Sequence, residues 1–321
     1  MQSIKKILVD IDPDKQEQPA LIKALQFAKQ QPITIKLLSC LYYPSVVASN
    51  LLTPKQLEKT QAAILKMNQS RLNKLIAKHS QENVTYDTEV MWHSPIYQGI
   101  LKVVDNFKPD LVIKATHQHK TITRRLFTPT DWYLLKACPV PLLLVRNHKW
   151  TKNNSVVAAI DPEHNLSKTS ELDKNILKAG FYISSCIGMP LHALHCFDPS
   201  YWDILLEAVD KSGIWADVFS FDEHQNESMV LEQLRYQHNL KFSEECSEYV
   251  PNSENQHIIS GDINHVLPQT LTHLNAGILV LGTTYRTGLL GITAQRLIEA
   301  VDCDLLAIKP KGFEAPFHWC L

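Results

Sequence analysis

The chain has 321 residues, about twice the usual length of one domain, and this length predicts two domains. Hydrophobic residues make up 45% and charged residues 20% of the sequence, ordinary proportions that exclude a disordered chain and a membrane-embedded one. The formal net charge is −1, so no overall field favours nucleic acid or anionic lipid as a partner. Seven cysteines without a C-x-x-C pair, and no N-terminal stretch long enough for a signal peptide, predict a cytoplasmic protein with free thiols.

The first half of the chain alternates between apolar runs and amphipathic stretches. An apolar strand over 7–9 ends at Asp12-Pro13 and leads into a helical pattern from Ala20 to Gln30. A second strand over 33–40 is followed by a long amphipathic helical region and by a strand-loop-helix unit. We then expect a buried strand over 110–116, a helix over 130–137 and a last strand over 142–145.

The second half repeats this order. A strand beginning at Ser155 ends at Asp161-Pro162 and is followed by a helical pattern over 172–184. The remaining predicted elements are strands over 191–197, 277–283 and 305–308 and a helix over 293–300. Self-similarity at half the chain length indicates a duplication. The irregular, acidic stretch 198–252 is predicted to be a surface insertion that includes a helix over 227–238.

Strands that alternate with helices are typical of parallel sheets with crossover helices. The predicted fold class is therefore α/β, with two tandem doubly wound parallel-sheet domains. The polar, aperiodic stretch 147–155 predicts a linker. We place the first domain at 1–148, the second at 154–310 and a C-terminal tail at 311–321.

The loops that could hold a ligand differ between the two halves. In a doubly wound sheet, ligands bind outside the carboxyl ends of the strands. The second half has a loop there with three glycines, hydroxyl side chains and one arginine, features that suit a phosphate group whose oxygens accept bonds from backbone N–H groups. The candidate ligand-binding residues are Asp161, Gly282, Thr283, Arg286, Gly288, Gly291 and Thr293.

The corresponding loop of the first half, from Ala115 to Asp131, contains no glycine. Gly99 is the only glycine in residues 1–150. A β-carbon at every position hinders the close approach of backbone to phosphate, and Pro129 has no N–H to donate. We therefore expect no conventional nucleotide site in this half.

Several segments resemble the universal stress protein family. They are Ile11-Asp-Pro-Asp14, Met91-Trp-His93, Phe127-Thr-Pro-Thr-Asp-Trp132 and the loop from Gly282 to Gly288 with the residues that follow it. The resemblance covers nearly the whole chain. It implies tandem domains of the adenine-nucleotide-hydrolase-like fold that pack as an internal pseudo-dimer, much as single-domain relatives form homodimers, with further homodimerisation left open.

Single-domain relatives that bind ATP carry G-x2-G-x9-G-(S/T) after the fourth strand and an acidic residue after the first. Carried over to this sequence, Asp161 is that acidic residue, Gly282 the first glycine and Gly291 the third, while Tyr285 replaces the second. The spacing from Gly282 to Gly291 is nine positions instead of the family's thirteen, and Ile292 occupies the Ser/Thr position. ATP is thus left open as a ligand of the second domain, and no cofactor is certain.

The resemblance also implies a cytoplasmic stress-response protein, including tolerance of DNA damage, with no catalysed reaction. We find no nucleophile or P-loop motif and name no catalytic or metal-binding residue. The alternative is a scaffold that binds an unidentified protein partner and whose nucleotide sites are degenerate, since both loops depart from the ATP motif. A weak ATPase is a third hypothesis, and it lacks an identifiable base.

Overall fold

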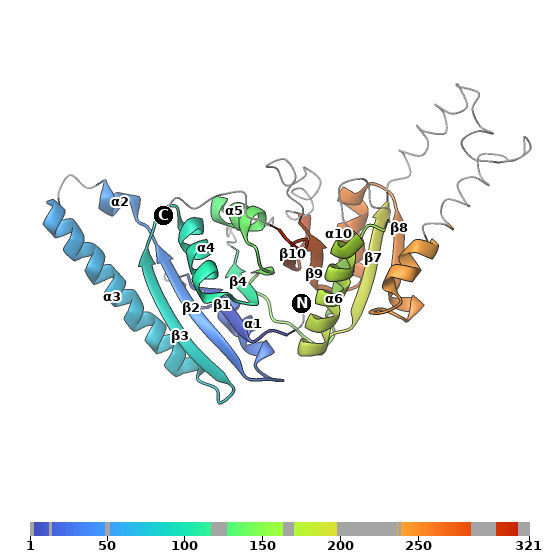
Figure 1. The fold of residues 1–321 in the computed structure, drawn as a ribbon, viewed down its shortest axis with the longest axis horizontal. Helices are drawn as coiled ribbons and strands as arrows, with labels where there is room; N and C mark the ends of the chain where they lie inside the picture. Colours follow the sequence, from blue (N-terminus) through green and yellow to red (C-terminus); the bar gives the residue numbers. More distant parts are fainter. Residues whose placement is uncertain are drawn as a thin grey trace, which may run out of the picture.

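The computed structural model describes residues 3–12, 15–48, 52–116, 127–162, 170–197, 236, 239–283 and 300–313. Its centre is a single ten-stranded sheet with the strand order β3-β2-β1-β4-β5-β10-β9-β6-β7-β8. Neighbouring strands run parallel except at the junction of β5 with β10. Figure 1 shows the first five strands on one side of this junction and the last five on the other.

The first half of the sheet is built from short apolar strands joined by crossover helices. Its elements are β1 (Lys6–Asp10), α1 (Pro19–Phe27), β2 (Ile33–Leu41), α2 (Pro44–Val47), α3 (Pro54–His79), β3 (Val84–Trp92), α4 (Ile96–Phe107), β4 (Leu111–Ala115), α5 (Pro129–Ala137) and β5 (Leu142–Val145).

The second half has the same strand order, counted from its own first strand. Its elements are β6 (Ser155–Ala159), α6 (Ser170–Ile187), β7 (Leu191–Phe197), the 3₁₀ helix η1 (Ser253–Asn255), β8 (Gln256–Ser260), α10 (Ile263–His273), β9 (Ala276–Gly282) and β10 (Asp304–Ile308). Residues 239–246 are also helical.

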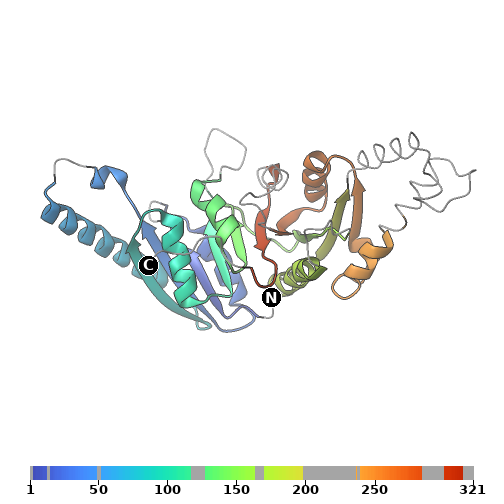
Figure 2. The same cartoon turned by 45° about the horizontal axis from the view of Figure 1, so that its top comes forward.

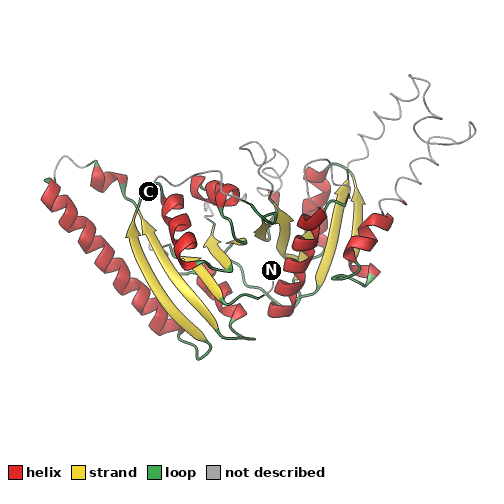
Figure 3. Ribbon diagram, viewed as in Figure 1, coloured by secondary structure: helices red, strands yellow, loops and turns green. Residues whose placement is uncertain are grey.

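Helices cover both faces of the sheet (Figure 3). On one face α1 and α6 pack over alternate strand residues such as Val9 and Ala158, and these two helices also contact each other. On the other face α4, α5 and α10 pack over residues such as Leu8 and Val157. Burial of both faces explains why the strands are almost continuously apolar. Helix α3 lies along the outer strand β3 at one end of the molecule (Figures 1 and 2).

The two halves are joined by backbone pairing and by a buried ion pair. Leu144 of β5 lies opposite Leu305 of β10. Next to this junction, Lys23 Nζ of α1 lies 2.5 Å from Asp304 Oδ2, and both side chains are at most 3% exposed. Asp304 also accepts hydrogen bonds from the backbone N–H of Arg146 and from Trp150 Nε1, each at 2.8 Å. A carboxylate of the second half therefore holds three groups of the first half and the linker in place.

The predicted strands and crossover helices that fall within the described residues are confirmed, with differences at their ends. The helix predicted to end at Gln30 ends at Phe27, because residues 28–30 form a turn that leads into β2. The helix predicted to end at residue 184 continues to Ile187, where Gly188 at φ 71° terminates it. The helices predicted over 227–238 and 293–300 lie almost entirely outside the described residues, as does most of the tail.

The described cysteines are all free thiols. No helix in the described part of the chain combines the length and the apolar character needed to cross a membrane.

Candidate functional site

The structure brings the described candidate residues of the second half to one edge of the sheet. Strands β6 and β9 are parallel neighbours, so the residues that follow them lie at the same carboxyl edge. Asp161 follows β6, and Gly282 and Thr283 end and follow β9. The other candidates, Arg286, Gly288, Gly291 and Thr293, lie outside the described residues. Their roles stay predictions.

Thr283 carries a buried hydroxyl that has no partner in the described part of the chain. Its backbone N–H donates to Ile308 O at 2.9 Å. Its side chain is buried, the residue being 2% exposed, and Oγ1 has no hydrogen-bond partner among the described residues. A buried hydroxyl without a partner costs about 1–3 kcal/mol. Thr283 therefore offers a hydrogen bond at the strand edge to any group that reaches it.

Gly282 has a packing role that the sequence does not reveal. A β-carbon at this position would lie 2.8 Å from Leu172 Cδ2 and 3.1 Å from Ile176 Cδ1. Both residues are in α6 and at most 1% exposed. Because the end of β9 approaches α6 this closely, the glycine is explained by packing before any ligand is considered.

His195 lies close to the same edge, and the sequence reasoning assigned it no ligand role. It is 2% exposed, and its Nδ1 lies 3.2 Å from the carbonyl oxygen of Ile160, the residue before Asp161. His192 points to the other face of the strand, where its Nδ1 lies 3.0 Å from Nε2 of His257 on β8. The opposite orientations follow from the two-residue period of a strand.

The first half has a cavity of about 620 Å³ at the corresponding edge. It lies beyond the ends of β1, β2 and β4 and beside the start of α5, and its wall includes Asp12, Tyr42 and Thr130. This is the position in which a doubly wound sheet binds its ligand. The charged groups in its wall decide what it can hold.

Lys114 forms a buried ion cluster in that wall. Its Nζ lies 3.4 Å from Asp10 Oδ2 and 3.3 Å from Asp131 Oδ1. Burial lowers the pKa of Lys114, but the two carboxylates outweigh this effect and raise it above 10.5. Burial raises the pKa of Asp10, and Lys114 opposes that shift. One cation therefore serves two buried carboxylates at the end of β4.

Asp131 is also part of the start of α5. Its Oδ2 accepts from the backbone N–H of Thr128 at 2.8 Å, and its own backbone N–H donates to Thr128 Oγ1 at 3.2 Å. This capping box satisfies N–H groups at the helix start, the groups that would otherwise bind an anion. These N–H groups are already satisfied, and the charge of Lys114 is already paired with two carboxylates. We therefore expect no phosphate cradle in the first half.

Among the described residues, no group of three or more histidine, cysteine, aspartate or glutamate side chains is arranged to hold a metal ion. The histidines at positions 117 and 119 fall outside the described part.

Comparison with known proteins shows what the chain is similar to. The sequence profile described as "Universal stress protein family" matches residues 3–146. The match extends over the whole chain in individual relatives: the protein named universal stress protein E from Photorhabdus laumondii is 29% identical, over 98% of each chain. Residues 3–146 thus match a universal stress protein domain, and the whole chain is similar to proteins named universal stress protein E. The protein named universal stress protein E from Escherichia coli K12 is 28% identical, over 98% of this chain and 97% of its own length.

Solved structures agree with this assignment to the universal stress protein fold. A putative universal stress protein from Pseudomonas aeruginosa superposes with a TM-score of 0.71 at 22% identity, covering 96% of this chain and 94% of its own. A universal stress protein from Archaeoglobus fulgidus gives a TM-score of 0.61 at 13% identity, covering 95% and 98%. The predicted tandem α/β fold is thereby confirmed.

Proposed function

We propose that this chain is a cytoplasmic stress-response protein whose second domain binds a nucleotide or a related small anion at the carboxyl edge of β6 and β9. The observation that carries the proposal is the buried hydroxyl of Thr283, which has no hydrogen-bond partner among the described residues and lies at the same sheet edge as Gly282 and Asp161. Occupancy of this edge shifts the protein between two surface states that a partner distinguishes. The chain acts by binding and catalyses no reaction.

Uncharged residues at two strand-end positions favour the second domain over the first as the ligand-binding half. Its strand ends carry Ala159 and Leu281 where the first domain has Asp10 and Lys114, counted from the matching Asp-Pro and strand-end positions. Neither of these two positions of the second domain carries a carboxylate that would oppose an anion. A contribution to tolerance of DNA damage is part of the same proposal and rests on the family resemblance.

The test is thermal unfolding with and without Mg-ATP, Mg-ADP and AMP. A ligand at 100 times its dissociation constant adds about 2.7 kcal/mol to the free energy of unfolding and raises the melting temperature. We expect Asp161→Asn, Thr283→Val and Arg286→Ala to abolish this increase. Gly282→Ala is a poor test, because it also disturbs the packing against Leu172.

The first domain supplies matched controls. Asp12 and Thr116 occupy the positions that correspond to Asp161 and Thr283, and Thr116 likewise donates its backbone N–H across to the last strand, to Val145 O at 2.8 Å. Asp12→Asn and Thr116→Val should preserve the nucleotide-dependent increase. If no nucleotide raises the melting temperature of the unmodified protein, the ligand-free scaffold is the better description.

A further inference from the structure

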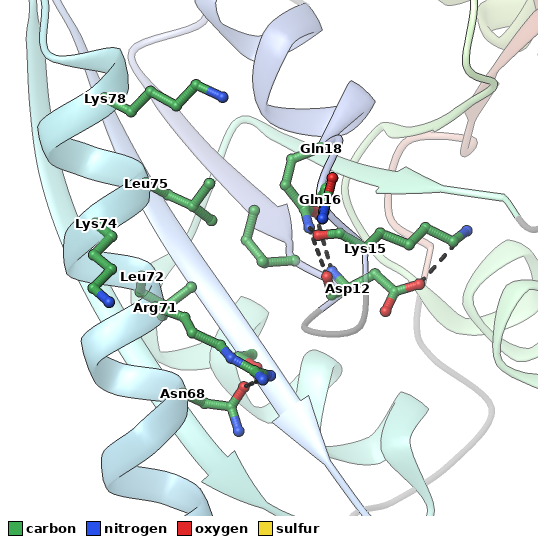
Figure 4. Close-up of a pocket in the computed structure, with 12 residues that line it drawn as sticks. Asp12, Lys15, Gln16, Gln18, Asn68, Arg71, Leu72, Lys74, Leu75 and Lys78 are labelled. Atoms are coloured by element: carbon green, nitrogen blue, oxygen red, sulfur yellow. Dashed lines mark hydrogen bonds and ion pairs between the residues drawn. The ribbon is translucent and has the colours of Figure 1, made fainter.

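A second cavity, of about 440 Å³, lies in the first domain on the face covered by α1 and α3. Its walls are helix α3, the carboxyl-terminal half of β2 and the loop between β1 and α1 (Figure 4). Ser39 lines this cavity, whereas Cys40, whose side chain points to the opposite face of β2, lines the strand-end cavity described above. The two cavities are thus separate spaces that meet only near Ile11, Asp12 and Lys15.

The cavity exists because α3 does not close on its neighbours. Along this long helix only Asn68 and Leu72 are buried, and its contacts are with β3 at the edge of the sheet. Its face toward α1 carries long polar side chains rather than a continuous apolar stripe. A space therefore remains between α3 and the loop that precedes α1.

The floor of the cavity contains buried polar groups. Ser39 is 1% exposed, and its hydroxyl has no hydrogen-bond partner among the described residues. Asn68 is also 1% exposed, and its Oδ1 lies 3.5 Å from Nη1 of Arg71. A buried hydroxyl that the protein leaves unsatisfied is a position at which a bound molecule gains a hydrogen bond without displacing a protein contact.

The walls are strongly basic. Among the described residues, four cationic side chains, those of Lys15, Arg71, Lys74 and Lys78, line the cavity together with one carboxylate, that of Asp12. Asp12 Oδ2 lies 3.6 Å from Lys15 Nζ. In Figure 4, Arg71 and Lys78 extend from α3 toward the loop that holds Asp12 and Lys15. In a chain whose net charge is −1, this local excess of positive charge favours an anion.

We propose that this cavity binds a small phosphorylated organic molecule, with the phosphate held by Arg71 and the neighbouring lysines and the organic body hydrogen-bonded to Ser39 and Asn68. An arginine recognises phosphate through two parallel hydrogen bonds. The volume falls in the range of small-molecule sites, far beyond the needs of a free phosphate ion. This site is independent of the strand-end site in the second domain.

Isothermal titration of the full chain tests the proposal. The ligands are glucose 6-phosphate, fructose 1,6-bisphosphate and 3-phosphoglycerate, with fructose and inorganic phosphate as comparisons. We expect saturable one-to-one binding of at least one sugar or acid phosphate that weakens as salt is added. Fructose should not bind, and inorganic phosphate should bind at least about tenfold more weakly than the organic phosphate.

Matched charge variants of α3 identify the site. Arg71→Gln with Lys78→Gln should weaken binding about tenfold or more, because both lost cations line the cavity. Lys59→Gln with Lys66→Gln removes the same net charge from exposed positions of α3 outside the cavity and should change affinity less than about twofold. Equal weakening by both pairs would overturn the proposal, since it would reflect only the total charge.

Ser39→Leu fills the cavity from its floor and should abolish binding while the melting temperature is retained. Thr283→Val, in the second domain, should leave this binding unchanged, so failure of one proposal is distinguishable from failure of the other. Absence of saturable binding by all three organic phosphates at millimolar concentration would overturn the inference. Inorganic phosphate binding as tightly as the organic phosphates would also overturn it.

Discussion

The two strand-end edges of this protein have the same strand order and opposite chemistry. In the first domain, β1 and β4 end in Asp10 and Lys114, which form a buried ion cluster with Asp131. In the second, the corresponding residues are Ala159 and Leu281. Duplication therefore preserved the packing of the sheet while the groups that could meet a ligand diverged, which illustrates that function depends on the site and not on the fold.

The largest effect should come from giving the first domain the residue of the second. Lys114→Leu leaves Asp10 and Asp131 buried without their cation, and removing one partner of a buried pair costs about 3–5 kcal/mol. Urea unfolding measures the loss. Adding Asp10→Ala should recover part of it, because one of the two unpaired carboxylates is removed. Lys102→Leu, at an exposed position of α4, is the control, and a Lys114→Leu loss no larger than that control's would contradict the cluster's role.

The link between the domains should be the next most sensitive feature. Asp304→Asn leaves Lys23 buried without its carboxylate and should cost about 3 kcal/mol. It should also broaden the unfolding transition or divide it into two, because the domains lose their shared ion pair. Asp302→Asn is the matched control: Asp302 also pairs with Arg146, but its side chain is 89% exposed, so the loss should stay below about 1 kcal/mol. Similar losses in both variants would argue against a buried link.

Glycines in crossover helices of the two domains should respond differently to a methyl group. A β-carbon at Gly99 would lie 2.6 Å from Cys40 Sγ and 3.0 Å from His93 Cβ, so Gly99→Ala should destabilise by about 1–3 kcal/mol through overpacking. At Gly180 the nearest atoms are Leu191 Cδ1 at 3.0 Å and Ala158 Cβ at 3.4 Å. There the higher helix propensity of alanine should offset the strain to within about 1 kcal/mol. Thermal unfolding of both variants measures the two losses of stability. A larger loss for Gly180→Ala than for Gly99→Ala would contradict the prediction.

The smallest expected effect is the pH dependence of stability that arises from titratable side chains on the outer strands. In the second domain His192 contacts His257, and burial, assisted by a neighbouring histidine, lowers the pKa of each below 6.5. Their contribution to stability is therefore present above pH 6.5 and lost as the pH falls through the lowered values. In the first domain Lys36 lies opposite Asp87 instead, and its hydrogen bond is the main cause that lowers the pKa of Asp87 below 3.8.

Between pH 7 and about pH 5 the wild type should thus lose a small amount of stability, and His257→Gln should lose less, because one of the two titrating histidines is gone. Asp87→Asn should show the same loss as the wild type over this range, because Asp87 titrates only at lower pH. Urea unfolding at the two pH values measures the difference. An identical pH dependence in wild type and His257→Gln would remove the histidine pair as its source.

Apolar runs were sufficient to predict the inner strands, because parallel strands that are buried on both faces have little freedom to include polar residues. Lys114 interrupts such a run, yet its meaning depends on Asp10, which is 104 positions earlier in the chain and becomes a neighbour only when β1 pairs with β4. Gly282 was interpreted as part of a phosphate loop, and its contact with Leu172 was invisible for the same reason. The cavity lined by Ser39 and α3 could not be predicted either, because it depends on the distance between α3 and the sheet.

The antiparallel junction of β5 with β10 places two equivalent halves side by side in one polypeptide. Two identical subunits joined in this way would carry two identical crevices, and a change in one would appear in the other. Fusion removes that symmetry constraint. A ligand of the second domain would accordingly bind with a stoichiometry of one per chain, and its saturation curve would be hyperbolic rather than cooperative between equivalent halves.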